Sequence, residues 1–281
     1  MAIHNEVIQN GWLVYKPIIQ KDAEGNYKKG LCILKTMRGK RSIGDKIRGI
    51  YYDTPVIQSK NPEDIKKMEQ WDAGDIIELK GFLASREVKK ARRCTYCNNK
   101  LSTPGVQMYI QPIFMTRREQ GVNEVEARNR LNELCEISNK IFAIGNLTKD
   151  PVMGKTNKGV SNTAYQLAID RKFRVREDSV EERTDFPWVK TYGAQAELDN
   201  ESLTTGSVVM VDGALRVRSD YPRSDKCPIC GETFTWKDTT MEIVPYSVEY
   251  LRNFKTPENL EEDAIATLGL AQGGNAEEPE E

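Results

Sequence analysis

The sequence has few of the residues on which enzymatic chemistry usually depends. Its 281 residues include one histidine, His4, and no Gly-x-Ser-x-Gly turn of the kind that presents a nucleophilic serine. It also has no pair of carboxylates at a spacing that suggests acid–base work, and the stretch VMGKT lacks the first glycine of a phosphate-binding loop. These absences argue against hydrolase and nuclease chemistry and predict a protein that is not an enzyme.

Long apolar runs are missing as well. No stretch approaches the ~20 apolar residues of a membrane-spanning helix, and the start MAIHNEVIQNGW does not resemble a signal peptide. We therefore expect a cytoplasmic protein with no membrane partner. With 38% apolar and 30% charged residues, the chain is long enough for two globular domains.

Charge is nearly balanced overall but unevenly distributed. Residues 257–281 hold eight acids and no Lys or Arg, which leaves 41 bases against 34 acids in the remainder. A basic body with an acidic tail favours a polyanion ligand that the tail repels. A solvated, disordered terminus without a function is the alternative.

Six cysteines are present, and four of them form two Cys-x-x-Cys pairs, Cys94/Cys97 and Cys227/Cys230. In a reducing compartment such pairs indicate metal binding, and four thiolates suit a structural zinc ion. The pairs could share one site, pair between chains, or hold no metal; a shared site is favoured if the two loops are equivalent parts of a repeat. We exclude His4, Cys32 (expected in a core strand) and Cys135 (expected in a helix) as ligands.

The chain repeats itself. GDIIELKGFL at 74–83 and GSVVMVDGAL at 206–215 align at an offset of 132 residues, which becomes 133 at the two cysteine pairs. Each half also shows β-branched and aromatic stretches between turn residues, with one helix-like segment at 61–73 and at 194–205. Five strands with a helix between the third and fourth describe an OB-fold barrel.

We therefore predict an all-β dominated chain of two tandem OB-fold barrels. Each carries a Cys-x-x-Cys zinc-knuckle loop between its last two strands, with a connecting helix near 121–139 and a disordered acidic tail. The expected boundaries are 1–118 for the first barrel, 119–139 for the linker, 140–254 for the second barrel and 255–281 for the tail.

The second half resembles the bacterial single-stranded DNA-binding protein family. The resemblance covers about 140–218 and rests on IFAIGNLTKDPVM, NTAYQLAIDRKF, TDFPWVKTYGAQAE and GSVVMVDGALRVR, in that order. The family normally has one such domain per chain, no cysteine knuckle, and an apolar tip on its tail. The tandem form with knuckles looks like a variant, of the kind a phage or mobile element could carry.

The resemblance implies sequence-tolerant binding of single-stranded DNA in replication, recombination or repair. It implies replication or recombination proteins as partners, a possible homodimer, and a place at the nucleoid, or in the host cytoplasm if a phage encodes the chain. An RNA-binding or transcription-associated OB/zinc module and an architectural protein-interaction subunit are the alternatives.

Single-strand binding needs stacking rings and a basic groove. In the second half, the resemblance and the flanking bases place the rings at Phe173, Phe186, Trp188 and Tyr221. The bases beside them are Lys155, Lys158, Lys172, Arg174, Arg176, Arg216, Arg218 and Arg223. The first half offers Lys35, Arg38, Lys40, Arg41, Tyr51 and Tyr52, with a further basic run at Lys89, Lys90, Arg92 and Arg93. Trp12 and Trp71 are expected in the core.

Overall fold

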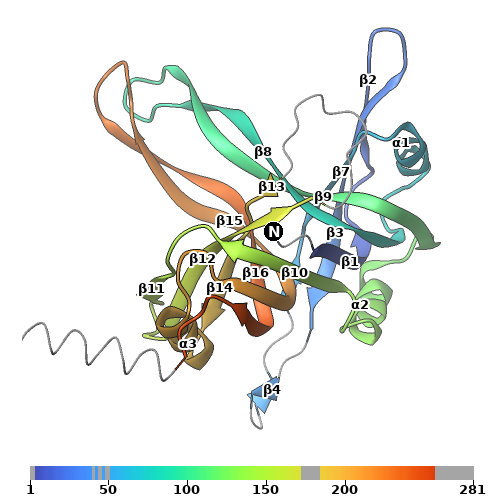
Figure 1. The fold of residues 1–281 in the computed structure, drawn as a ribbon. Coiled ribbons are helices and arrows are strands. Elements are labelled where there is room, and N and C mark those ends of the chain that lie inside the picture. The colour runs from blue at the N-terminus through green and yellow to red at the C-terminus, as the bar shows by residue number, and fades with distance from the viewer. Residues whose placement is uncertain (1–3, 40–41, 44–45, 48–50, 172–183, 257–281) are drawn as a thin grey trace, which may run out of the picture.

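The computed structural model describes residues 4–39, 42–43, 46–47, 51–171 and 184–256, and these residues form mainly β-structure (Figure 1). The acidic tail and part of the predicted binding surface thus lie outside the described residues. The first half contains β1 (His4–Leu13), β2 (Ile18–Lys21), β3 (Tyr27–Arg38), β4 (Ser42–Ile43), β5 (Lys46–Ile47), β6 (Tyr51–Asp53), β7 (Val56–Ser59), α1 (Pro62–Glu69), β8 (Ile76–Arg93) and β9 (Lys100–Glu119). After α2 (Glu124–Glu133), the second half contains β10 (Asn139–Leu147), β11 (Val152–Lys155), β12 (Ser161–Asp170), β13 (Thr184–Asp185), β14 (Trp188–Tyr192), α3 (Ala194–Ser202), β15 (Val208–Lys226) and β16 (Thr233–Arg252).

The two halves close in the same way. In the first, β1 pairs with both β8 and β3, and β7 runs parallel to β9 at Ile57 and Ile110. In the second, β10 pairs with β15 and β12, and β14 runs parallel to β16 at Val189 and Ile243. A sheet that returns to its first strand in this way is a small barrel, so the prediction of two tandem OB-fold barrels is confirmed.

The repeat seen in the sequence has a structural reason at its glycines. Gly74 and Gly206 have φ of +98° and +84°, a conformation that favours glycine. At Gly81 and Gly213 an added Cβ would lie 2.3 Å and 2.6 Å from a carbonyl oxygen of the neighbouring strand. Each of these pairs therefore marks a place where the backbone tolerates no side chain.

The drift of the offset from 132 to 133 is a β-bulge. Strand β15 pairs Arg218 with Thr240 and then Tyr221 with Asp238, so it contains one extra residue. Strand β8 pairs with β9 without such a shift from Gly81 to Arg93. The inserted residue thus lies between Arg218 and Tyr221 and kinks only the second hairpin.

Gly81→Ala should destabilise the protein strongly. The new methyl group would press on the Gln111 carbonyl in the centre of the first barrel, and we expect the free energy of unfolding to fall by about 1–3 kcal/mol. Gly154→Ala is the matched control, because the nearest atom to its Cβ would be 3.8 Å away. Urea unfolding measures both, and equal midpoints would contradict the close approach.

A continuous sheet joins the barrels. Strands β1 and β10 pair antiparallel, with Val7 opposite Ile141. Because Val7 pairs with Gly81 and Ile141 with Gly213, these two residues are equivalents that meet at a pseudo-twofold axis. We expected a shared metal to set the angle between the barrels; the structure shows that this sheet already sets it.

Paired asparagines support the joint from both sides. Asn5 exchanges two hydrogen bonds with the Leu83 backbone, at 2.7 Å and 2.9 Å. Asn139 does the same with Leu215, at 2.8 Å and 3.0 Å. All four groups are buried, so each side chain satisfies backbone atoms that would otherwise be desolvated without partners.

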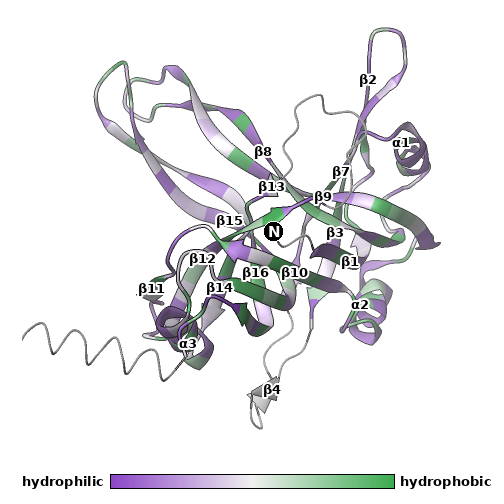
Figure 2. Ribbon diagram, in the orientation of Figure 1, coloured by the Kyte–Doolittle hydropathy of each residue, from purple (hydrophilic) through white to green (hydrophobic). Residues whose placement is uncertain are grey.

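One large hydrophobic core extends through both barrels, and Figure 2 shows that the barrel strands carry most of the apolar residues. Trp71 is part of this core, and Trp12 is partly buried, with its indole N–H donating to the Val122 carbonyl at 3.0 Å. Cys32 is buried in β3, where burial raises the pKa of its thiol to about 12. Among the described residues, no helix is long and apolar enough to span a membrane.

The connecting helix is shorter than predicted. It starts after Asn123, whose side chain accepts from two backbone N–H groups, and it ends at Glu133. Cys135 therefore lies in the turn after the helix and not in it, because Asn139 already begins β10. The helix ends early since the chain must re-enter the central sheet.

Candidate nucleic-acid interface and metal centre

Strand β14 presents a row of side chains on the outside of the second barrel. Val189 and Thr191 point into the barrel and are buried, so Trp188, Lys190 and Tyr192 alternate with them on the outer side. The Trp188 ring is 37% exposed, and the Lys149 ammonium lies 5.2 Å from its centre. An exposed ring beside a cation can stack on a base while the cation meets a phosphate.

Two further aromatic rings stand near this row. Phe186, in the turn before β14, is 44% exposed, and its carbonyl accepts from the Gln166 amide at 3.2 Å. Tyr221 lies on β15 just after the bulge, with the Arg218 and Arg223 guanidinium carbons 5.4 Å and 4.7 Å from its ring centre. The structure thus places Phe186, Trp188 and Tyr221 at the surface of one barrel.

A cluster of cations continues the row onto β15. Arg216 donates to the Tyr192 hydroxyl at 2.7 Å and lies 3.4 Å from the Glu242 carboxylate. Burial lowers the pKa of Lys190, and Arg218 and Arg216 lower it further against the opposing effect of Glu242. Three cations with one neighbouring acid suit a phosphate ligand. Sequence reasoning missed Lys190 and Tyr192, although the alternation in WVKTY was the signal that could have found them.

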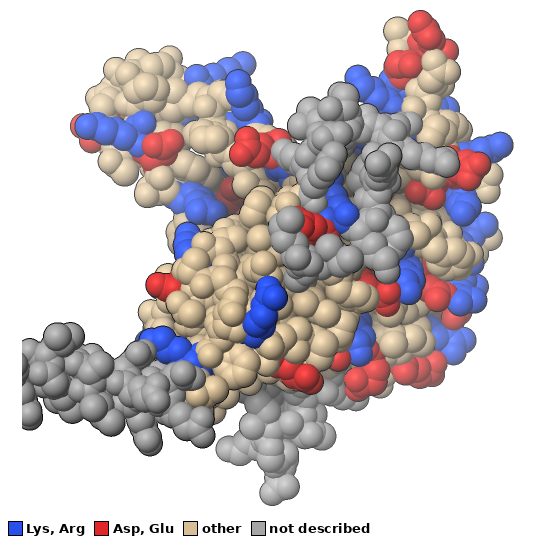
Figure 3. Space-filling view, viewed as in Figure 1, with Lys and Arg blue, Asp and Glu red and all other residues tan. Residues whose placement is uncertain are grey.

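The β11–β12 hairpin adds two exposed bases to the second barrel. Lys155 ends β11 and Lys158 lies in the turn, where Gly159 has φ of +76°. The corresponding hairpin of the first barrel carries Asp22 and Glu24 instead, and acidic residues gather at its tip (Figure 3). The two hairpins therefore present opposite charges to a polyanion.

The first barrel uses two of its predicted bases internally. Lys35 pairs with Glu124 at 3.0 Å, and its ammonium lies 5.3 Å from the Tyr52 ring centre. Arg38 pairs with the buried Asp53 and lies 4.9 Å from the ring centre of Tyr51, which is 54% exposed. Of the remaining predicted residues, Lys40, Arg41, Lys172, Phe173, Arg174 and Arg176 lie outside the described residues.

The rings on the second barrel have no counterparts on the first. At an offset of 132, Phe186 corresponds to Thr54 and Trp188 to Val56. The first barrel instead exposes Tyr15, which is 67% accessible. The duplicated surfaces have therefore diverged, with the stronger set of stacking rings on the second.

The long hairpins β8–β9 and β15–β16 extend beyond the barrels as two arms that lie side by side (Figure 1). They touch along their length, where Lys90 and Arg92 of the first arm both reach Asp238 of the second, at 2.7 Å and 3.1 Å. Two bases of the predicted basic run thus hold the arms together. The other two, Lys89 and Arg93, are exposed.

The arm tips bring all four paired cysteines together. The Cys94 and Cys230 sulfurs are 3.7 Å apart, those of Cys97 and Cys227 are 3.8 Å apart, and all four lie within 4.8 Å of one another. A tetrahedron with zinc–sulfur bonds of about 2.3 Å has sulfurs about 3.8 Å apart. The geometry therefore fits one metal ion held by both barrels.

The two knuckle loops are built alike. Asn98 and Gly231, 133 residues apart, have φ of +57° and +78°, so asparagine takes the left-handed position that glycine fills in the second loop. The Tyr96 N–H points to the Cys94 sulfur at 3.4 Å. The Asn99 N–H lowers the pKa of Cys97 to about 6, which favours the thiolate that a metal binds.

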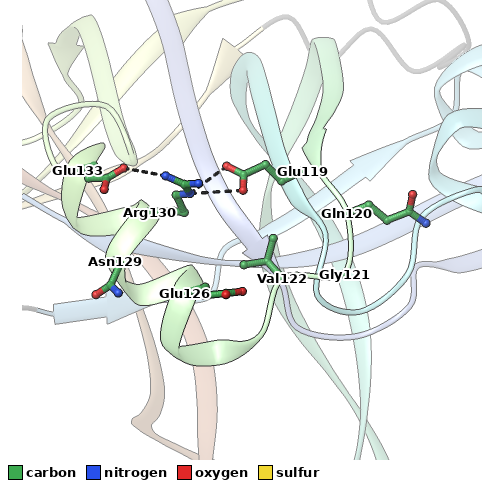
Figure 4. A pocket seen from close by; sticks show the side chains of 8 residues that line it. All are labelled: Glu119, Gln120, Gly121, Val122, Glu126, Asn129, Arg130 and Glu133. Atoms are coloured by element: carbon green, nitrogen blue, oxygen red, sulfur yellow. Dashed lines mark hydrogen bonds and ion pairs between the residues drawn. The ribbon is translucent and has the colours of Figure 1, made fainter.

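One surface hollow lies away from these features, between the end of β9 and α2 (Figure 4). Three acids line it, and Arg130 bridges two of them, Glu119 and Glu133, at 3.2 Å and 3.3 Å. Its remaining acid, Glu126, leaves the hollow unsuited to a polyanion. We assign it no part in binding nucleic acid.

Comparison with known proteins agrees with this picture. Residues 138–226 match the single-strand binding protein family. A single-stranded DNA-binding protein of Thermotoga maritima is 38% identical over 89 residues, covering 31% of this chain and 63% of that protein. Single-stranded DNA-binding protein 1 of Staphylococcus aureus is 28% identical over 141 residues, covering 49% of this chain and 83% of that protein.

The fold of the whole chain resembles solved structures. The wild-type single-stranded DNA binding protein of Thermus aquaticus superposes with a TM-score of 0.57 at 18% identity, covering 90% of this chain and 95% of that one. A deletion mutant of the same protein gives a TM-score of 0.57 at 19% identity, over 91% and 98%. The tandem arrangement of two barrels is thus shared with a known fold.

The sequence matches are concentrated in the second half, and the first of them spans less than two thirds of its relative. Within that half, several motifs and the surrounding fold agree. Residues 138–226 are therefore a domain of the single-strand binding protein family, and the resemblance predicted from the sequence is confirmed.

Proposed function

We propose that this protein binds single-stranded DNA with little sequence preference and protects it during replication, recombination or repair. The observation that carries the proposal is the set of exposed rings, each with cations or a cationic row beside it, on the domain that matches the family. Rings accept any base because every base has a π-face, and cations follow the phosphates. The second barrel is the main binding surface, and the first adds Tyr51 and Tyr52.

Titration with oligo-dT of graded length tests the proposal directly. Tryptophan fluorescence should be quenched on binding, since Trp188 lies on the proposed surface. Single-stranded RNA and duplex DNA serve as competitors. Preference for RNA would favour a transcription-associated module, equal competition by duplex would contradict single-strand recognition, and no binding at all would leave an architectural role.

Phe186→Ala should cost about 1–3 kcal/mol of DNA-binding free energy, because one stacking platform is lost. The thermal unfolding midpoint should change little, since the ring is 44% exposed. Phe114→Ala is the matched control: its ring is 49% exposed but lies on β9 of the first barrel. A variant that melts early and loses binding only as it unfolds would show that Phe186 is a core residue.

We further propose that the metal at the arm tips is a structural zinc ion. The four ligands are Cys94, Cys97, Cys227 and Cys230, and four thiolates leave no open position for catalysis. Leu101, Phe234 and Trp236 pack around the sulfurs and shield them from water. A homodimer and docking of replication or recombination proteins stay predictions, which mass measurement and pull-down with such proteins test.

A further inference from the structure

A buried aspartate of the second barrel is bound by the first. Asp185 has no exposed surface, and its carboxylate accepts from the Ser85 backbone N–H at 2.6 Å and from the Ser85 hydroxyl at 3.0 Å. Arg171 donates to both carboxylate oxygens, at 2.7 Å and 2.8 Å. It also donates to the Ser85 carbonyl at 3.1 Å, so all three residues form one closed group.

The first barrel has the same device in the opposite direction. Asp53 is 4% exposed, and its carboxylate accepts from the Val217 backbone N–H of the second barrel at 2.9 Å. Arg38 of its own barrel donates to the other oxygen. Asp53 and Asp185 are 132 residues apart, as are Ser85 and Val217, so the duplication brought both contacts.

Each aspartate reaches the same part of the opposite barrel. Ser85 in β8 and Val217 in β15 lie where these strands leave the barrels to become the arms. Each aspartate also opens an Asp-x-Pro turn, with Pro55 or Pro187 two residues later. The turn thus starts from a point that the other barrel holds.

The aspartates stand beside the rings proposed to stack on DNA. Asp185 is followed directly by Phe186 and, after Pro187, by Trp188. Asp53 follows Tyr51 and Tyr52, and Arg38 contacts both Asp53 and the Tyr51 ring. Buried ion pairs add little net stability, because desolvation offsets their attraction. Their directional hydrogen bonds fix geometry instead.

We propose that Asp53 and Asp185 are positioning residues, each of which holds the ring-bearing segment of its own barrel against the arm root of the other, so that the two barrels present their rings in one fixed frame. The inference rests on the proposed function, since the rings must bind DNA. Preorganised groups lose less entropy on binding, which raises affinity for a strand that touches both barrels.

Asp185→Asn tests the positioning role with a sign that charge alone would reverse. Loss of one negative charge should tighten DNA binding slightly, whereas loss of the clamp should weaken it roughly tenfold, the size of one charge-assisted hydrogen bond. Asp72→Asn is the charge-matched control, because Asp72 pairs with Lys16 at an exposed site. Its affinity for oligo-dT should stay equal or rise.

Ser85→Ala provides a milder variant in case Asp185→Asn does not fold. It removes one hydrogen bond from the first barrel to Asp185 and should weaken binding roughly threefold. A double-mutant cycle with Phe186→Ala then separates positioning from stability. Removal of the ring should cost less in the Ser85→Ala background, although the two residues belong to different barrels. Val211→Ala, a buried change in the second barrel, should lower the unfolding midpoint and leave the cost of Phe186→Ala unchanged.

The outcomes separate the two proposals. Wild-type protein that does not bind oligo-dT overturns the proposed function. Wild-type protein that binds, with additive effects of Ser85→Ala and Phe186→Ala and with Asp185→Asn as tight as Asp72→Asn, overturns the positioning role alone. Coupling between Ser85 and Phe186 without coupling at Val211 supports it.

Discussion

Cys94→Ser should empty the metal site of the whole chain, and Cys227→Ser should do the same although it lies in the other barrel. Each arm supplies two of the four sulfurs, and two thiolates without a histidine cannot complete a tetrahedron. Elemental analysis of protein purified without chelator should give one zinc per wild-type chain and close to none for either variant. Cys135→Ser, outside the cluster, should keep its zinc.

The structural consequence should be confined to the arm tips. Hydrogen exchange should accelerate around residues 93–100 and 226–233, while the β1–β10 pairing stays protected, because that pairing joins the barrels without the metal. Two zinc ions per chain would contradict the shared site. A metal-free wild-type protein would leave the cysteines as thiols packed against Phe234.

Raising salt fourfold should weaken oligo-dT binding about 100-fold. Five cations of the second barrel, Lys149, Lys155, Lys158, Lys190 and Arg218, face the proposed surface. Each phosphate contact to a single strand contributes about 0.7 to the logarithmic slope, so about five contacts give a slope near −3.5. Affinity measured at several salt concentrations gives this slope, and a flat dependence would exclude a phosphate-tracking groove.

The β11–β12 hairpin allows a sharper form of that experiment. Replacing both Lys155 and Lys158 by glutamine should reduce the slope by about 1.4, since two phosphate contacts are lost. Lys16→Gln is the control, because this exposed base of the first barrel is paired with Asp72 at 2.9 Å. An equal change of slope in both variants would mean that general charge, and not this hairpin, governs binding.

Local signals in the sequence were sufficient for the fold and the metal centre. Positive-φ glycines, Cys-x-x-Cys turns and alternating strands depend on neighbours close in the chain, so their repetition at 132–133 residues revealed two barrels. The equivalence of Cys94 and Cys227 then favoured one shared site, and the structure brings the sulfurs together. Residues predicted on exposed rings, such as Trp188, also lie at the surface.

The basic residues of the first half show where such reasoning ends. Lys35, Arg38 and Lys90 looked available for DNA in the sequence, but each has an acid from a distant segment as its partner: Glu124, Asp53 and Asp238. A charge cannot be assigned to solvent or to a ligand until its spatial neighbours are known. The same holds for Lys190, whose cationic surroundings come from β15.

The sequence by itself determined that this chain is a duplicated pair of barrels, with four cysteines at equivalent turns and a second half of the single-strand binding type. Only the tertiary structure decided how the copies are joined. The antiparallel meeting of Val7 with Ile141 and the crossed contacts of Asp53 and Asp185 link residues 132 to 164 positions apart or across the two halves. Such pairings depend on the twist and closure of both barrels, which no local pattern of residues encodes.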